Sequence, residues 1–447
     1  MRYLALLLLP ALLSAAAPVV SNVRAQQRLG TKLIDITYDL ADADGGTVYI
    51  SAQLFAGTTA LPAFSLSGHI GAGVTPGTNK TIVWNAGQDW NRQYTTNGKV
   101  RIIADDLTVT PPNVTMAYVP AGFSVNSYGN HAYSSSAKVF SNGFFMDKTE
   151  ISKATWDTVR TWALANGYTF DNTGLATATD HPVVGVSWYD AVKWCNARSQ
   201  KDGLAPVYFT DASRTAVYKT GTVIVRGTFC NWSADGYRLP TRAEWSKAAW
   251  GGSTSGPYYW PSYYGSGAEI LNVGQANFFY SYAQRAHPWD FSATTALLTG
   301  PYNMANYGTT PVGYYNGSQV ITGLTLGVAV VDMKNGFGLY DMAGNAAEWL
   351  WDSYYSEVTA TTEYLDDNYK GPDLGLGAER YYAAGRFESA SGSNWDSQTK
   401  TSATVVGTEK IFFYQEYSGG NRLTDGTSIL SSSRLAPQVG LRTVRGR

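Results

Sequence analysis

The residues whose types and spacing best suit cation chemistry lie in Asn335–Asp352, NGFGLYDMAGNAAEWLWD. Asp341 and Glu348 are seven residues apart, and Gly344-Asn345 between them reaches positive φ at low cost. We therefore expect a turn followed by a short apolar helix over Ala346–Trp351, with free backbone carbonyls between the two carboxylates. Calcium binds oxygen sets of this kind. In a structural alternative, Asp341 caps a helix and Glu348 pairs with an arginine.

Two cysteines and four histidines are the other candidate ligands. In an exported protein the even cysteine count favours a disulfide between Cys195 and Cys230, although spacing alone leaves two buried thiols as the alternative. The histidines, at positions 69, 131, 181 and 287, are too scattered to predict a metal cluster. We expect a structural role for His181.

Composition limits the classes of function. A chain of 447 residues has room for two or three domains, and its net charge of −1 gives no bulk field that favours nucleic acid or an anionic membrane. Met1–Ala17 has a basic start, an apolar run and a small-residue end, which are typical of a signal peptide. We expect a secreted, periplasmic or cell-surface protein. No other stretch approaches the length of a transmembrane helix.

The elements that must position these residues fall into two parts. Residues 18–107 alternate apolar and polar residues in short runs between turns, which predicts an immunoglobulin-like or fibronectin-like β-sandwich. Thr108–Asn113, TVTPPN, is expected to be a linker.

The second part, residues 114–447, mixes strands and helices. Strands are expected at Val114–Phe123 and Gly143–Lys148. Ser152, Ser187 and Thr241 each precede an apolar helical pattern and are the predicted N-caps. Glu244, three residues after Thr241, would complete a capping box.

Four motifs of this second part occur in the order of a known family. They are Phe144–Ile151 (FFMDKTEI), His181–Trp188 (HPVVGVSW), Gly236–Trp245 (GYRLPTRAEW) and Gly338–Trp349 (GLYDMAGNAAEW). Together they resemble the formylglycine-generating enzymes, or sulfatase-modifying factor domains, over about residues 112–447. The resemblance implies an α+β chain in which the sandwich precedes a loop-rich variant of the C-type lectin fold.

The resemblance also implies ligands and structural roles. One calcium site would use the side chains of Asp341 and Glu348 and the carbonyls of Gly344 and Ala346. A second would involve Asn277 and the carbonyl of Phe278. Glu150 would help to fix the fold, and Arg238 and Glu244 would belong to a buried polar network. Family cysteines near the two present here favour pairing.

The family's catalytic cysteines bind copper and lie near a segment that corresponds here to Arg380–Ser389, where this sequence has none. We therefore expect calcium but not copper. The preferred hypothesis is a non-catalytic binding or structural protein whose aromatic loops contact a glycan, a peptide or neighbouring subunits. The alternative is an oxidase of the formylglycine-generating type, or another enzyme on this fold. The candidate contact stretches are Tyr258–Tyr264, Phe278–Tyr282 and Tyr354–Tyr355.

Overall fold

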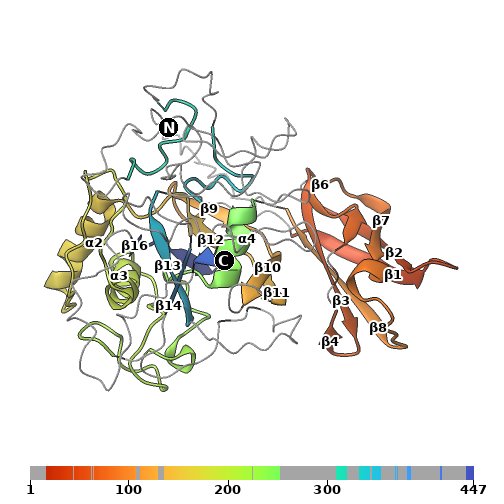
Figure 1. Ribbon diagram of the computed structural model, residues 1–447, viewed down its shortest axis with the longest axis horizontal. Coiled ribbons are helices and arrows are strands. Elements are labelled where there is room, and N and C mark those ends of the chain that lie inside the picture. The colour runs from red at the N-terminus through yellow and green to blue at the C-terminus, as the bar shows by residue number, and fades with distance from the viewer. Residues whose placement is uncertain are drawn as a thin grey trace, which may run out of the picture. The chain divides into compact units, whose positions relative to one another are not determined.

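The computed structural model divides into two compact units, residues 1–110 and 111–447 (Figure 1). It describes residues 17–251 apart from 44, 62, 64, 107–110, 129–134 and 224. Beyond these it describes residues 309–319, 332–342, 345–353, 368, 370, 380–383, 413–414 and 439–446. The predicted signal peptide up to residue 16, the ligands Asn277, Phe278 and Gly344, and the three aromatic stretches lie outside the described residues.

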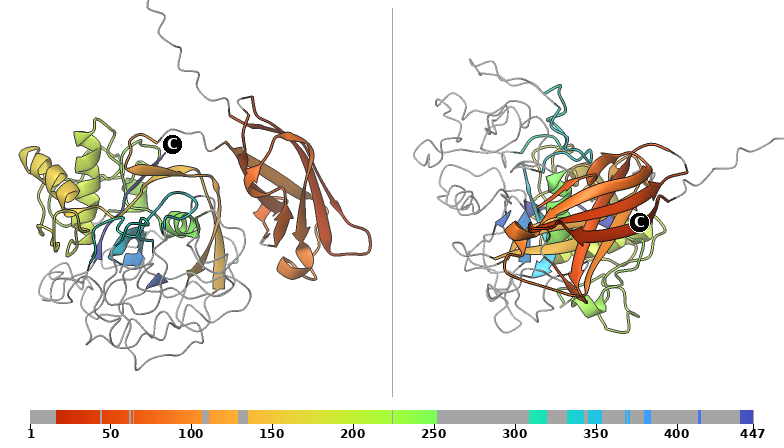
Figure 2. Two further views of the ribbon diagram at one scale, coloured as in Figure 1. Left: turned by 90° about the horizontal axis from the view of Figure 1, so that it is seen from above. Right: turned by 90° about the vertical axis from the view of Figure 1, so that its right-hand side faces the viewer.

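Two antiparallel sheets form the first unit (Figure 2). They share one core, in which Ile36 and Ile82 of one sheet and Val48 and Ile50 of the other are at most 1% exposed. The first sheet has the order β1 (Val19–Gln27), β2 (Leu33–Ala41), β7 (Gly77–Asn85), β5 (Leu66–Gly68). The second has the order β4 (Thr59–Ala60), β3 (Val48–Ala56), β6 (Gly71–Val74), with β8 (Gly98–Asp105) also paired to β3. One short helix, α1 (Ala86–Asp89), follows β7.

The second unit is a mixed α/β structure. Its helical elements are α2 (Lys153–Ala165), α3 (Trp188–Lys201), the 3-10 turn η1 (Gly227–Phe229) and α4 (Arg242–Trp250). Its described residues form three sheets. In the first, β10 (Gly122–Tyr128) pairs with β11 (Ser135–Ser141), and the second has the order β17 (Val444–Gly446), β12 (Phe144–Asp147), β9 (Met116–Val119). The third has the order β15 (Phe413–Tyr414), β14 (Arg380–Ala383), β13 (Ala347–Ser353), β16 (Val439–Gly440).

The predicted N-caps of α2, α3 and α4 are confirmed. Ser152 accepts a hydrogen bond from the backbone of Thr155, and Ser187 accepts one from Asp190. Thr241 and Glu244 form the full capping box. These caps satisfy backbone N–H groups that have no partner inside the helix. Among the described residues, no helix is long and apolar enough to cross a membrane.

One predicted element is wrong. Residues Ala346–Trp351 were expected to form a helix, but Ala347–Trp351 belong instead to strand β13, which pairs antiparallel with β14 and parallel with β16. Pairing with strands far along the chain overrides the helix preference of Ala346-Ala347-Glu348. In consequence Asp341 precedes a strand and caps no helix.

Candidate functional site

The turn before β13 is held by side chains that bond to the segment 309–313. Asp341 and Asn345 have φ of +56° and +62°, which short polar side chains tolerate best. The Oδ1 of Asn345 accepts from the backbone N–H of Thr310 at 2.8 Å, and the Oδ2 of Asp341 accepts from that of Gly313 at 2.5 Å. Two backbone positions of this segment, Thr310 and Gly313, are thus fixed against this turn.

Glu348 lies at the start of β13 and is completely buried. Arg442 donates from Nε to both of its carboxylate oxygens, at 3.0 and 3.2 Å, and its Nη2 lies 2.9 Å from Oε1. The indole of Trp245 donates to Oε2 at 2.8 Å. Both oxygens of Glu348 therefore face nitrogen donors, as the structural alternative from the sequence predicted.

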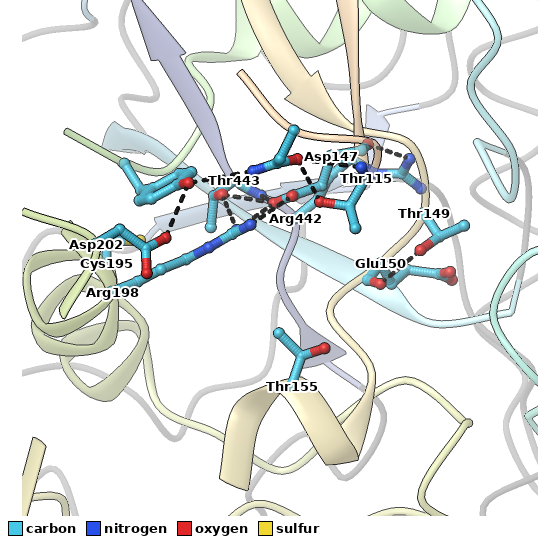
Figure 3. A network of polar contacts seen from close by, with 12 residues as sticks. Thr115, Asp147, Thr149, Glu150, Thr155, Cys195, Arg198, Asp202, Arg442 and Thr443 are labelled. Carbon is cyan, nitrogen blue, oxygen red and sulfur yellow. Dashed lines mark hydrogen bonds and ion pairs between the residues drawn. The ribbon is translucent and has the colours of Figure 1, made fainter. Parts of the chain in front are cut away.

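Arg442 is positioned by the C-terminal segment and by β12. Its Nη1 donates to the carbonyl of Asp147 at 3.1 Å and its Nη2 to the carbonyl of Tyr340 at 2.8 Å. Figure 3 shows the neighbouring network in which Arg198 and Thr443 bond to the Asp147 carboxylate. These bonds fix the segment that follows β16, and so fix the guanidinium of Arg442 against Glu348.

Glu150 brings another carboxyl group to the same place. It is 2% exposed, and its Oε1 accepts a long hydrogen bond of 3.4 Å from the N–H of Ala346. Its Oε2 is buried and has no hydrogen-bond partner among the residues that the structure describes. Burial raises the pKa of Glu150 well above its usual range, the carboxylates of Asp341 and Glu348 raise it further, and Arg442 opposes them. Burial also raises the pKa of Asp341. We call Glu150, Asp341, Glu348 and Arg442 the acidic cluster.

The calcium set predicted from the resemblance fits this geometry only in part. Glu348 is saturated by Arg442 and Trp245, and the N–H of Ala346 faces Glu150. Within the described part of the chain, no group of three or more His, Cys, Asp or Glu side chains has the arrangement of a metal site. Of the two predicted carboxylate ligands, only Asp341 is not paired with an arginine.

The two cysteines do not form the disulfide that we favoured; both are buried thiols in the structure. Cys195 lies within α3, is 0% exposed, and burial raises its pKa far above the usual range. The thiol of Cys230, which follows η1, donates to the carbonyl of Arg226 at 3.3 Å. The alternative of two buried thiols describes the structure.

The buried polar network expected around Arg238 is present. Both terminal nitrogens of Arg238 donate to Glu244, each at 2.6 Å, and Glu244 also accepts from the backbone of Thr241. His181 is a buried structural residue, as expected, and its Nδ1 lies 3.0 Å from the hydroxyl of Thr309.

The sequence analysis assigned no role to Arg442. Its partner Glu348 lies 94 residues away, so no local pattern indicated the pair.

Geometry and sequence together define the class of protein. The chain belongs to the family of sulfatase-modifying factor enzyme 1-like domains, whose family model matches residues 105–445. It is 29% identical to the chaperone protein LppX of Paenibacillus barcinonensis over 262 residues, 52% of this chain and 78% of that protein. It is 28% identical to the formylglycine-generating enzyme of Thermomonospora curvata over 199 residues, 44% of this chain but only 42% of the enzyme.

Two solved structures are also similar. CarF covers 74% of this chain and 98% of its own, with 22% identity and a TM-score of 0.43. The Treponema denticola variable protein 1 covers 74% and 95%, with 18% identity and a TM-score of 0.41.

Proposed function

We propose that this protein is an exported, non-catalytic binding or structural protein. In this proposal an immunoglobulin-like sandwich precedes a calcium-stabilised, lectin-like domain that contacts a glycan, a peptide or neighbouring subunits. The observation that carries the proposal is the state and place of the cysteines.

Copper chemistry of the family type needs accessible thiolates. No cysteine follows Cys230 in this sequence, and the segment Arg380–Ser389 contains none. Cys195 and Cys230 are both part of the hydrophobic core around α2 and α3. Burial keeps the Cys195 thiol protonated, because it raises the pKa, and a protonated thiol is a poor metal ligand and nucleophile.

A second observation favours a binding role. The relative of which 78% matches this chain is named a chaperone protein. The aromatic stretches proposed as contact loops are rich in tyrosine, which supplies rigid contact area with a polar tip.

Copper binding and peptide oxidation test the proposal. We expect the purified protein to take up no stoichiometric Cu(I) and to leave a cysteine peptide of sulfatase type unchanged in the presence of oxygen, as judged by mass spectrometry. One equivalent of bound copper together with conversion of the peptide cysteine to formylglycine would establish the oxidase instead. Binding is measured separately on glycan and peptide arrays, and self-association by analytical ultracentrifugation; saturable binding or assembly is expected.

A further inference from the structure

The first unit presents a leucine to solvent on the turn between β1 and β2. Leu29 is 98% exposed, which makes it the most exposed large hydrophobic side chain among the described residues. A single exposed apolar side chain is common and needs no partner. The way in which Leu29 is held, and the charges around it, distinguish it from such a side chain.

Hydrogen bonds order this turn in the absence of any partner. Arg28 donates its N–H to the carbonyl of Leu33 at 2.9 Å. Thr31 donates its N–H and its hydroxyl to the carbonyl of Arg28, at 3.1 and 2.8 Å. Gly30 has φ of +73°, a value that glycine adopts without strain. A turn held in this way loses little conformational entropy when Leu29 is buried against another surface.

The loop after β7 belongs to the same end of the first unit. Leu33 of β2 is paired with Asn85 of β7, so the turn and the loop leave the sheet at the same edge. The ammonium of Lys32 donates to the side chain of Asn91 at 2.6 Å and links the two segments. This loop also carries Tyr94, which is 83% exposed. We call residues 28–32 and 86–97 the loop end.

The exposed charges of the loop end are basic. They belong to Arg28, Lys32 and Arg92. Asp89, the only acidic residue of the loop end, accepts from the backbone and hydroxyl of Ser65 and from the indole of Trp84. Asp35 of β2 pairs with Arg28 at 2.5 Å. Three cations thus face two carboxylates that already have donors, and the excess charge is positive.

We propose that the loop end docks on the surface of an anionic phospholipid bilayer, with Leu29 buried at the level of the acyl chains and the basic side chains at the headgroups. Apolar side chains flanked by Lys and Arg bind such surfaces. Leu29 distinguishes this partner from a soluble polyanion, which would pair with the cations and leave the leucine in water. A fluid bilayer also needs no preformed pocket for a side chain that is 98% exposed.

The rest of the chain adds no attraction, because the net charge of the whole protein is −1. Docking should therefore be reversible and strongly weakened by salt. The proposal concerns the first unit and does not depend on the proposed function, which uses the second.

Vesicle co-sedimentation tests the docking. The protein is prepared without the predicted signal peptide, whose apolar run would itself bind lipid, and is mixed with vesicles of phosphatidylcholine, with or without phosphatidylglycerol. Wild type is expected to sediment with the vesicles that contain phosphatidylglycerol at low salt. It should be released at about 1 M salt, where the screening length falls to about 3 Å.

Matched variants test the residues. Leu29→Ser should lower the partition coefficient about tenfold or more, because burial of a leucine is worth at least the free energy of a factor of ten. Arg92→Gln should lower it about fivefold. Val114→Ser, at an 87% exposed position of the second unit, and Lys80→Gln, near the opposite end of β7, should leave it unchanged. All four variants should keep the wild-type melting temperature.

Three results would overturn the proposal. One is the same binding to vesicles with and without phosphatidylglycerol, or to neither. Another is an equal loss in Leu29→Ser and Val114→Ser, or a loss in Arg92→Gln alone, which would fit a soluble polyanion. The third is a dimer in analytical ultracentrifugation that Leu29→Ser abolishes while vesicle binding is absent, which would make a second copy the occupant. None of these results changes the outcome of the copper and array experiments, so the proposed function is tested separately.

Discussion

The start of α4 and the turn before β13 both bury carboxylates beside an arginine, but in different proportions. At α4, burial acts to raise the pKa of Glu244. Two hydrogen bonds of 2.6 Å from Arg238, the Lys370 ammonium at 3.7 Å and the Thr241 N–H outweigh it, so the pKa of Glu244 falls to about 2. In the acidic cluster a single arginine faces three carboxyl groups, and the pKa of Glu150 rises. Cations beside a buried carboxylate keep it ionised, whereas burial raises the pKa of a carboxyl group that lacks enough of them.

Removing Arg442 is the strongest way to break this comparison. Arg442→Met leaves Glu348 buried without its partner, which should lower the free energy of unfolding by about 3 to 5 kcal/mol. Urea unfolding at pH 7.5 measures the loss. Arg214→Met, which removes an exposed arginine from the same unit, should have little effect. A small loss at Arg442 would mean that Glu348 is not held by this pair.

Titration of Glu244 tests the ion pair at the start of α4. The folded pKa of Glu244, about 2, lies below the unfolded value of 4.5, so its stabilisation is present above pH 4.5 and is lost as the pH falls towards 2. The shift corresponds to about 3 to 4 kcal/mol. Urea unfolding between pH 5 and 2 should show this loss in wild type. In Glu244→Gln the pH dependence should be weaker by the same amount, and equal slopes would contradict the assignment.

Asp352 sharpens the comparison because it faces the same helix start. Its Oδ2 accepts from the N–H of Arg242, and its Oδ1 is buried without a hydrogen-bond partner in the described part of the chain. Burial raises the pKa of Asp352 from 3.8 to about 6. The nearby carboxylate of Glu244 also raises it, whereas Arg242 and Lys370 lower it.

The free energy of unfolding should depend on the titration of Asp352 with the opposite sign to its dependence on Glu244. The folded protein binds the extra proton, so the free energy of unfolding should rise by about 3 kcal/mol as the pH falls from above 6 to below 4. Unfolding curves of wild type and Asp352→Asn, recorded side by side over this range, should differ by that rise. Asp157→Asn is the control, and it should keep the wild-type pH dependence.

The smallest expected effect comes from the N-cap of α4, Thr241, whose capping box includes Glu244. Thr241→Ala removes the acceptor for the Glu244 N–H and should cost about 1 kcal/mol. Thr158→Ala, which changes the same residue type inside α2, should be close to neutral. Melting temperatures of the two variants decide the point, and equal losses would contradict a special role for the cap.

Local interactions explain which parts of this fold were predictable. The caps at Ser152, Ser187 and Thr241 each depend on a residue three positions later, so the sequence displays them directly. Strand β13 was predicted as a helix because its pairing partners, β14 and β16, follow it at a distance.

The same difference between local and distant contacts applies to the candidate site. Asp341 and Glu348 were identified from their spacing, but the partners that decide their chemistry come from other segments. Glu150 meets the turn through Ala346, 196 residues later, and Arg442 reaches Glu348 across 94 residues. Sequence separation of this size leaves no periodic pattern, and only the folded chain shows that one carboxylate is paired and another is not.

The pairing of β12 with β17 has a consequence for the biogenesis of the protein. Asp147 bonds to Thr443 across 296 residues, and β17 completes the sheet that β12 and β9 begin. A nascent chain therefore cannot close this sheet while residues 439–446 are still inside the ribosome. Contacts between such distant segments form slowly, so we expect this sheet to be among the last parts of the fold to close.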